Sequence, residues 1–150
     1  MQTAGDKVIS TILKHDTKVT SYKIALLRAI NDIVLSFPDV HRQEKDVAVP
    51  LRMLAELWIA YYWPFVDAQQ PILQGQRVER DGHRRNDMSF RPTLTHLRQE
   101  WETLLQGTSQ PGDGFYLISE FKSLRRRQTY PPALQKAYDA TVTSIKGALL

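Results

Sequence analysis

The sequence predicts an all-α protein, a compact bundle of five or six helices with a long basic loop around residues 67–90. Apolar residues recur at helical spacing in several separate segments, and most prolines and glycines lie at the ends of those segments. Packing helix against helix is the simplest way to cover so many one-sided apolar stripes. At 150 residues, the chain is long enough to form a single domain, residues 1–150, around one buried core.

Two helices are predicted before residue 38. A short apolar stripe at residues 8–13 predicts the first, and the strongest pattern in the chain, Thr20 to Phe37, predicts the second. Pro38 is expected to end the second helix, because the residue before a proline avoids helical backbone angles. Its apolar face is made of adjacent pairs four residues apart and comprises Ala25, Leu26, Ala29, Ile30, Ile33, Val34 and Phe37.

The third helix is expected to begin at Pro50, where a missing backbone N–H costs nothing, and to kink or end at Pro64. Its inward face is predicted to be Leu51, Leu54, Ala55, Trp58, Tyr61, Tyr62 and Phe65. After the long loop, a fourth helix is expected from near Ser89, with Leu94, Leu97, Trp101, Leu104 and Leu105 inward.

The sequence PGDG at residues 111–114 predicts a turn. The apolar run at residues 115–121 that follows is too short to distinguish a helix from a strand. Pro131 and Pro132 are expected to open the last helix. The inward face of that helix is predicted to be Leu134, Ala137, Tyr138, Val142 and Ile145.

The composition excludes several classes of protein and of functional site. The chain has no cysteine, which excludes disulfides, thiolate metal ligands and a cysteine nucleophile. It has no apolar run near the ~18 residues of a membrane span, and its first residues lack the pattern of a signal peptide. We therefore expect a cytoplasmic protein without a membrane partner.

No catalytic motif is recognised, and whether the chain is an enzyme is left open. None of the four histidines has a histidine at i+4 or lies in a His-x-Glu arrangement, so no metal site is predicted. The chain also lacks a Gly-x-Ser-x-Gly elbow and a glycine-rich phosphate loop. No cofactor is predicted, and a self-contained enzyme with an unrecognised site is the least favoured hypothesis.

Arginines give the only candidate binding residues. The net charge is +4 and the pI is about 9.4, a moderate excess that suits a nucleic-acid partner without requiring one. The planar guanidinium of arginine can bind two phosphate oxygens at once. The alternative is that these arginines belong to an ordinary solvated surface and bind no phosphate. The predicted phosphate contacts are Arg84, Arg85, Arg91, Arg125, Arg126 and Arg127.

Four segments, in order, resemble the N-terminal helical region of bacterial HNH endonuclease proteins. They are TSYKIALLRAINDIV at 20–34, VAVPLRMLAELWIAYYWPFV at 47–66, DMSFRPTLTHLRQEW at 87–101 and PGDGFYLISEF at 111–121. The resemblance implies that residues 1–150 are the N-terminal part of a longer protein. It also implies that a divalent metal belongs only to a downstream nuclease module, which this sequence does not contain.

One set of residues has the order of the metal-binding triplet of an HNH nuclease module, which is Asp-His, Asn and His. The set is His15-Asp16, Asn31 and His41. Its first pair is His-Asp instead of Asp-His, and Asn31 lies in a helical stripe, so none of these residues is assigned as a ligand. The resemblance therefore implies a DNA-associated module that positions nucleic acid or docks the nuclease module and is not catalytic by itself. The alternative is a protein-interaction or oligomerisation module, for example one that forms a homodimer, with no nucleic-acid role.

Overall fold

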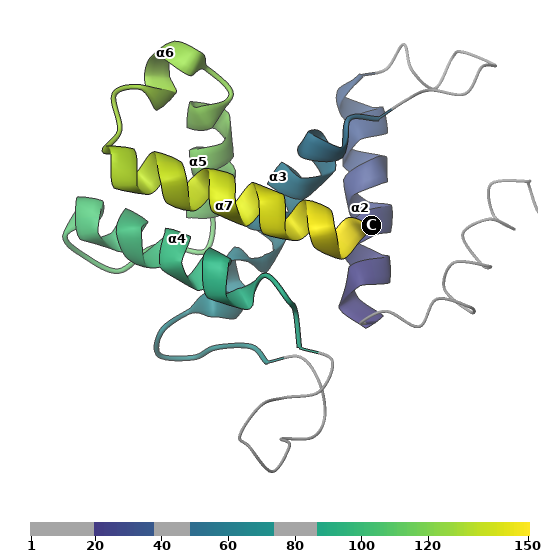
Figure 1. Cartoon of the computed structure of the whole chain (residues 1–150). Helices are drawn as coiled ribbons and strands as arrows, with labels where there is room; N and C mark the ends of the chain where they lie inside the picture. Colours follow the sequence, from purple (N-terminus) through teal and green to yellow (C-terminus); the bar gives the residue numbers. More distant parts are fainter. Residues whose placement is uncertain (1–19, 38–48, 74–86) are drawn as a thin grey trace, which may run out of the picture. The chain divides into compact units, whose positions relative to one another are not determined.

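The computed structural model describes residues 20–37, 49–73 and 87–150. Within these ranges it contains six α-helices and one 3-10 helix and no strand (Figure 1). The prediction of a mainly helical protein is therefore confirmed. The chain divides into two units, one formed by residues 1–48 and 74–86 and the other by residues 49–73 and 87–150. The helix predicted at residues 8–13 and the middle of the predicted loop lie outside the described residues.

In the first unit the structure describes one helix, α2 (Thr20–Ser36), which confirms the predicted helix. Three of the seven residues of its predicted apolar face are buried. In each adjacent pair the first residue is buried and the second is at least partly exposed. The buried residues are Ala25, Ala29 and Ile33. Ile30 and Phe37 are exposed, so the prediction that they face inward is wrong. Residues three or four apart form one line along a helix, and the second members lie beside that line.

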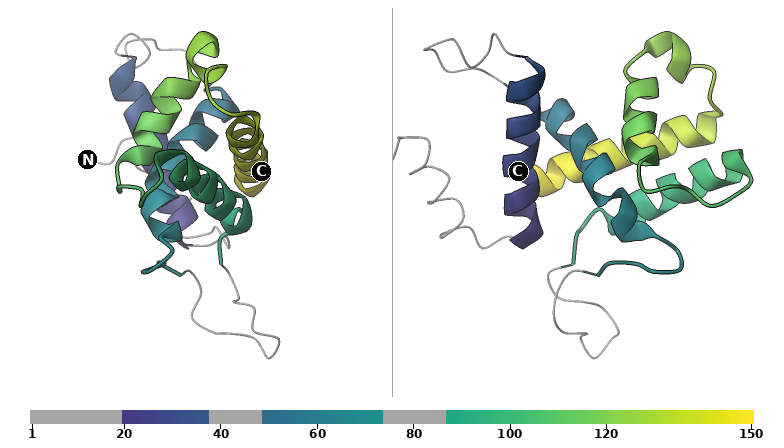
Figure 2. Two further views of the ribbon diagram at one scale, coloured as in Figure 1. Left: turned by 90° about the vertical axis from the view of Figure 1, so that its left-hand side faces the viewer. Right: turned by 180° about the vertical axis from the view of Figure 1, so that it is seen from behind.

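The second unit is a bundle of helices. Helix α4 packs along α7, and α3 packs against both α7 and α5 (Figures 1 and 2). No described helix is long and apolar enough to cross a lipid bilayer. The elements in chain order are α3 (Leu51–Tyr62), η1 (Trp63–Val66), α4 (Arg91–Leu105), α5 (Asp113–Phe121), α6 (Leu124–Arg127) and α7 (Pro132–Leu149).

Prolines and one left-handed residue set the helix boundaries. Helix α3 ends one residue before η1, which carries Pro64 in its first turn, as the sequence predicts. Pro132 occupies the first position of α7. Helix α4 ends at Leu105, and the positive φ of 56° at Gln106 turns the chain so that the Gly107 N–H donates to the Glu102 carbonyl at 3.3 Å. Residues 67–73 and 87–90 are not helical, which confirms both ends of the predicted loop.

The core of the second unit is aromatic. Trp58, Tyr62, Trp63 and Phe90 are almost fully buried, and the Tyr62 ring lies 5.5 Å from the Trp58 ring and 5.1 Å from the Phe90 ring, centroid to centroid. The whole predicted inward face of α7 is buried. Leu104 and Leu105, in the last turn of α4, are exposed, so their predicted burial is wrong.

Helix α5 resolves the alternative that the sequence leaves open for residues 115–121. It begins at Asp113, so the predicted turn at 111–114 is wrong for its last two residues. Gly114 is buried, and a Cβ atom there would lie 2.9 Å from Ala60 Cα and 3.0 Å from Trp63 Cβ. This glycine therefore allows α5 to approach α3 closely.

Candidate nucleic-acid interface

Arg91, in the first turn of α4, uses its donors inside the protein. Its Nε donates to Asp87 Oδ2 at 2.7 Å, and its Nη2 donates to Asp87 Oδ1 at 3.1 Å. The guanidinium also donates to the carbonyls of Phe65 at 3.1 Å and Ile72 at 2.7 Å. Its side chain is only 17% exposed. Arg91 therefore holds the segment that follows η1 against α4, and few of its donors remain for a phosphate.

Arg127 is also committed to an internal ion pair. Both of its terminal nitrogens bind the carboxylate of Asp139 on α7, and its guanidinium lies 5.4 Å from the Phe121 ring centroid. The hydrogen bond from Arg127 is the main cause that lowers the pKa of Asp139. Arg52 on α3 reaches the same carboxylate at 3.6 Å. This network fastens α6 and α3 to α7.

Three other cations are exposed where α5 passes into α6, and we call them the basic corner: Lys122, Arg125 and Arg126. Helix α6 is a single turn capped by Ser123, whose hydroxyl accepts the backbone N–H of Arg126 at 3.3 Å. Neither Lys122 nor Arg125 forms an ion pair within the part of the chain that the structure describes. The structure thus brings two of the predicted arginines together with a lysine that the prediction omitted.

Arg126 is anchored to the end of α5 while it stays open to solvent. Its Nε lies 3.3 Å from Glu120 Oε2, its Nη2 donates to the Ser119 carbonyl at 3.5 Å, and its side chain is 60% exposed. Glu120 also accepts hydrogen bonds from Tyr130 at 2.9 Å and Tyr116 at 3.3 Å. Glu120, the acid that pairs with Arg126, is therefore largely satisfied by the protein. The predicted contacts Arg84 and Arg85 lie outside the described residues.

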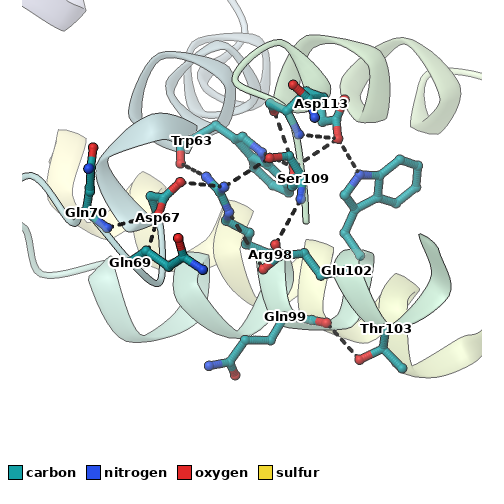
Figure 3. Close-up of polar contacts among 12 residues, drawn as sticks. Trp63, Asp67, Gln69, Gln70, Arg98, Gln99, Glu102, Thr103, Ser109 and Asp113 are labelled. Atoms are coloured by element: carbon teal, nitrogen blue, oxygen red, sulfur yellow. Dashed lines mark hydrogen bonds and ion pairs between the residues drawn. The ribbon is translucent and has the colours of Figure 1, made fainter. Parts of the chain in front are cut away.

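A second polar cluster is buried, and its centre is Arg98 on α4, which is 2% exposed (Figure 3). Its Nη1 donates to the Trp63 carbonyl at 2.9 Å, and its Nη2 donates to Asp67 Oδ2 at 3.2 Å and to the Ser109 carbonyl at 3.3 Å. Glu102 Oε1 lies 3.8 Å from its Nε. The guanidinium therefore joins η1, α4 and the segment that leads into α5.

Asp113 completes this cluster. Its Oδ2 accepts the Ser109 hydroxyl at 2.9 Å, the Gln110 N–H at 2.9 Å and the Trp101 indole N–H at 3.1 Å. Trp63 in turn donates to the Ser109 hydroxyl at 2.7 Å. Burial raises the pKa of Asp113, but the hydrogen bonds outweigh this effect and bring the pKa below its ordinary value. These contacts hold the start of α5 in place.

A cavity of about 330 Å³ adjoins the buried cluster. It has the size of a small ligand site, but both arginines in its wall are already paired with acids of the protein. Among the described residues, no group of three or more His, Cys, Asp or Glu side chains is placed to hold a metal ion. The cavity is lined by Val66, Asp67, Ala68, Pro71, Leu73, Arg91, Thr95, Arg98, Gln99 and Glu102.

Comparison with known proteins gives one family. The model of a family described as a domain of unknown function, DUF8808, matches residues 2–150. No curated protein and no solved structure matches the chain.

Proposed function

The chain belongs to the DUF8808 family, and for it we propose a DNA-associated helical module that holds the phosphate backbone and is not catalytic by itself. The basic corner supports this proposal. Three cations lie within five consecutive residues, all three are exposed, and Lys122 and Arg125 have no acid partner among the described side chains. Cations without an acid partner can neutralise phosphates without first breaking an internal ion pair.

Contacts of this kind set affinity and orientation without sequence preference. With the predicted contacts Arg84 and Arg85 added to Lys122, Arg125 and Arg126, the logarithm of the binding constant should fall against the logarithm of salt concentration with a slope of roughly −4 to −5. Arg91 and Arg127 were also predicted as contacts, but we assign them to internal ion pairs. The relation to HNH endonuclease proteins and the docking of a nuclease module stay predictions.

A charge-matched pair of variants tests the proposal. Lys122→Gln with Arg125→Gln removes two charges from the basic corner, and Lys136→Gln with Lys146→Gln removes two from α7. Fluorescence anisotropy with a labelled duplex should show weaker binding and a salt slope reduced by roughly 2 for the corner variant only. Equal slopes for the two variants, or no binding of DNA at low salt by the folded chain, would contradict the proposal.

A specific observation favours a second candidate, a protein-interaction or oligomerisation module. Leu104 and Leu105 in the last turn of α4 are exposed. Tyr116 on α5 is also exposed, and its ring contacts Trp101, which lies one turn before Leu104 and Leu105 on α4. Exposed apolar side chains that gather in one place often mark a protein interface. A stable dimer in light scattering that Leu104→Ser with Leu105→Ser dissociates, together with no affinity for DNA, would favour this candidate.

A further inference from the structure

Helix α5 exposes two aromatic rings next to the basic corner. Phe115 is 45% exposed and Tyr116 is 53% exposed, although the opposite face of the same helix is buried in the core. Large aromatic side chains contribute most to stability or binding when they are buried. Two such rings exposed to solvent on one short helix therefore indicate a binding surface. The sequence shows no regular alternation of aromatic and basic residues here, and the juxtaposition depends on the helical geometry.

Phe115 and the basic corner share one helical face. Phe115, Ser119 and Lys122 are spaced i, i+4 and i+7, and the backbone of Lys122 continues the helical conformation. Lys122 therefore lies about 10 Å from Phe115 along the axis. Arg126 also reaches back to the end of α5, where its Nη2 donates to the carbonyl of Ser119. Figure 1 shows α6 directly beyond the end of α5. Phe115 and Lys122 thus lie along one face of α5, and the exposed Tyr116 ring lies beside that face.

Both rings are held in place by the protein on one side. The Phe115 ring meets the Tyr61 ring edge-on at 6.1 Å and 63°. The Tyr116 ring lies 6.1 Å from the Trp101 ring, and its hydroxyl donates to Glu120. Rings fixed in this way lose little side-chain entropy when a ligand covers the exposed side.

We propose that this surface binds single-stranded DNA, with unpaired bases stacked on Phe115 and Tyr116 and with phosphates on Lys122, Arg125 and Arg126. This inference depends on the proposed function and narrows it to unpaired strands. In a duplex the faces of the bases are already stacked on each other, and only phosphates can reach the corner. An unpaired strand offers its bases and its phosphates together, and every base has a π-face that can stack.

The test compares a fluorescein-labelled twelve-nucleotide oligothymidine with a duplex of equal length at one salt concentration. Phe115→Ala should weaken binding of the oligothymidine roughly 5- to 150-fold, the loss of one stacked base, and leave binding of the duplex unchanged. Phe115→Leu, which keeps an apolar contact with Tyr61, should show the same loss at an unchanged melting temperature. Phe115→Trp should retain binding. Leu35→Ala, which removes an exposed apolar side chain from α2, is the control and should have no effect.

The outcomes separate the two proposals. This inference would be overturned if duplex and oligothymidine bind equally and neither Phe115→Ala nor Phe115→Leu has an effect. If the Lys122 and Arg125 variant still binds more weakly, the proposed function stands. No binding of either DNA would overturn both. Binding of a polyglutamate chain with the same dependence on Phe115 would show that the surface takes an acidic protein segment, and would also overturn the inference.

Discussion

Asp113 is the residue on which the buried polar cluster depends most clearly. Three donors from α4 and from the segment before α5 converge on one of its oxygens. Asp113→Ala should lower the free energy of unfolding at pH 7 by about 1–3 kcal/mol, because buried donors lose their acceptor. Asp113→Asn keeps an acceptor without the charge and should cost less. Urea unfolding monitored by circular dichroism measures both.

The pKa of Asp113 gives this prediction a pH dependence. Because the pKa in the folded chain lies below its ordinary value of 3.8, the carboxylate contributes stability above about pH 4. That contribution is lost as the pH falls through the lowered pKa. The difference between the native chain and Asp113→Ala should therefore shrink as the pH falls from about 5 through the lowered pKa. A difference that stays constant over this range would show that the charge of Asp113 has no part in stability.

Side-chain partners explain why the binding residues were only partly predictable. Asp87 lies only four residues before Arg91, so this local ion pair could have been recognised in the sequence. The acid that pairs with Arg127 is twelve residues away, and Arg98 binds a carbonyl 35 residues away. Such distances are closed only by the packing of helices. Charge type alone therefore could not separate Arg125 and Arg126, which stay open, from Arg127.

Helix α5 lies close to α3 because Gly114 has no side chain. In an exposed helix Gly→Ala stabilises by about 1 kcal/mol, but a Cβ at position 114 would overlap backbone and side-chain atoms of α3 and η1. Gly114→Ala should therefore destabilise by about 1–3 kcal/mol, the usual effect of overpacking. Gly147→Ala on α7, where a Cβ meets nothing within 4 Å, is the control and should stabilise by about 0.5–1 kcal/mol. Equal melting temperatures for the two variants would contradict this account.

The same helix shows what limits prediction of the elements. Helix α7 was predicted with its full inward face, because two prolines mark its start and 18 residues give a clear period. Helix α5 has nine residues and α6 has four, too few for a period to be read. The sequence predicts a turn at Gly114 because glycine usually marks one, whereas here its small size serves helix packing.

At the scale of the whole molecule, the single domain predicted for residues 1–150 remains a prediction, and the structure separates the chain into two units. The packed helix pairs α4 with α7, α3 with α7 and α3 with α5 all belong to the second unit. So do the aromatic core, the buried Arg98 cluster and the basic corner. The second unit therefore contains the residues that our proposals need, apart from Arg84 and Arg85.

A shortened chain tests whether this unit is sufficient. Residues 49–73 and 87–150, joined by a Gly/Ser linker as long as residues 74–86, should fold with helical circular dichroism and one cooperative unfolding transition, because their own helices supply the core. The shortened chain should bind oligothymidine with a salt slope reduced by roughly 1.4, since Arg84 and Arg85 are removed. An unchanged slope would exclude these two arginines as phosphate contacts. A chain that lacks a cooperative transition would show that the second unit needs the first in order to fold.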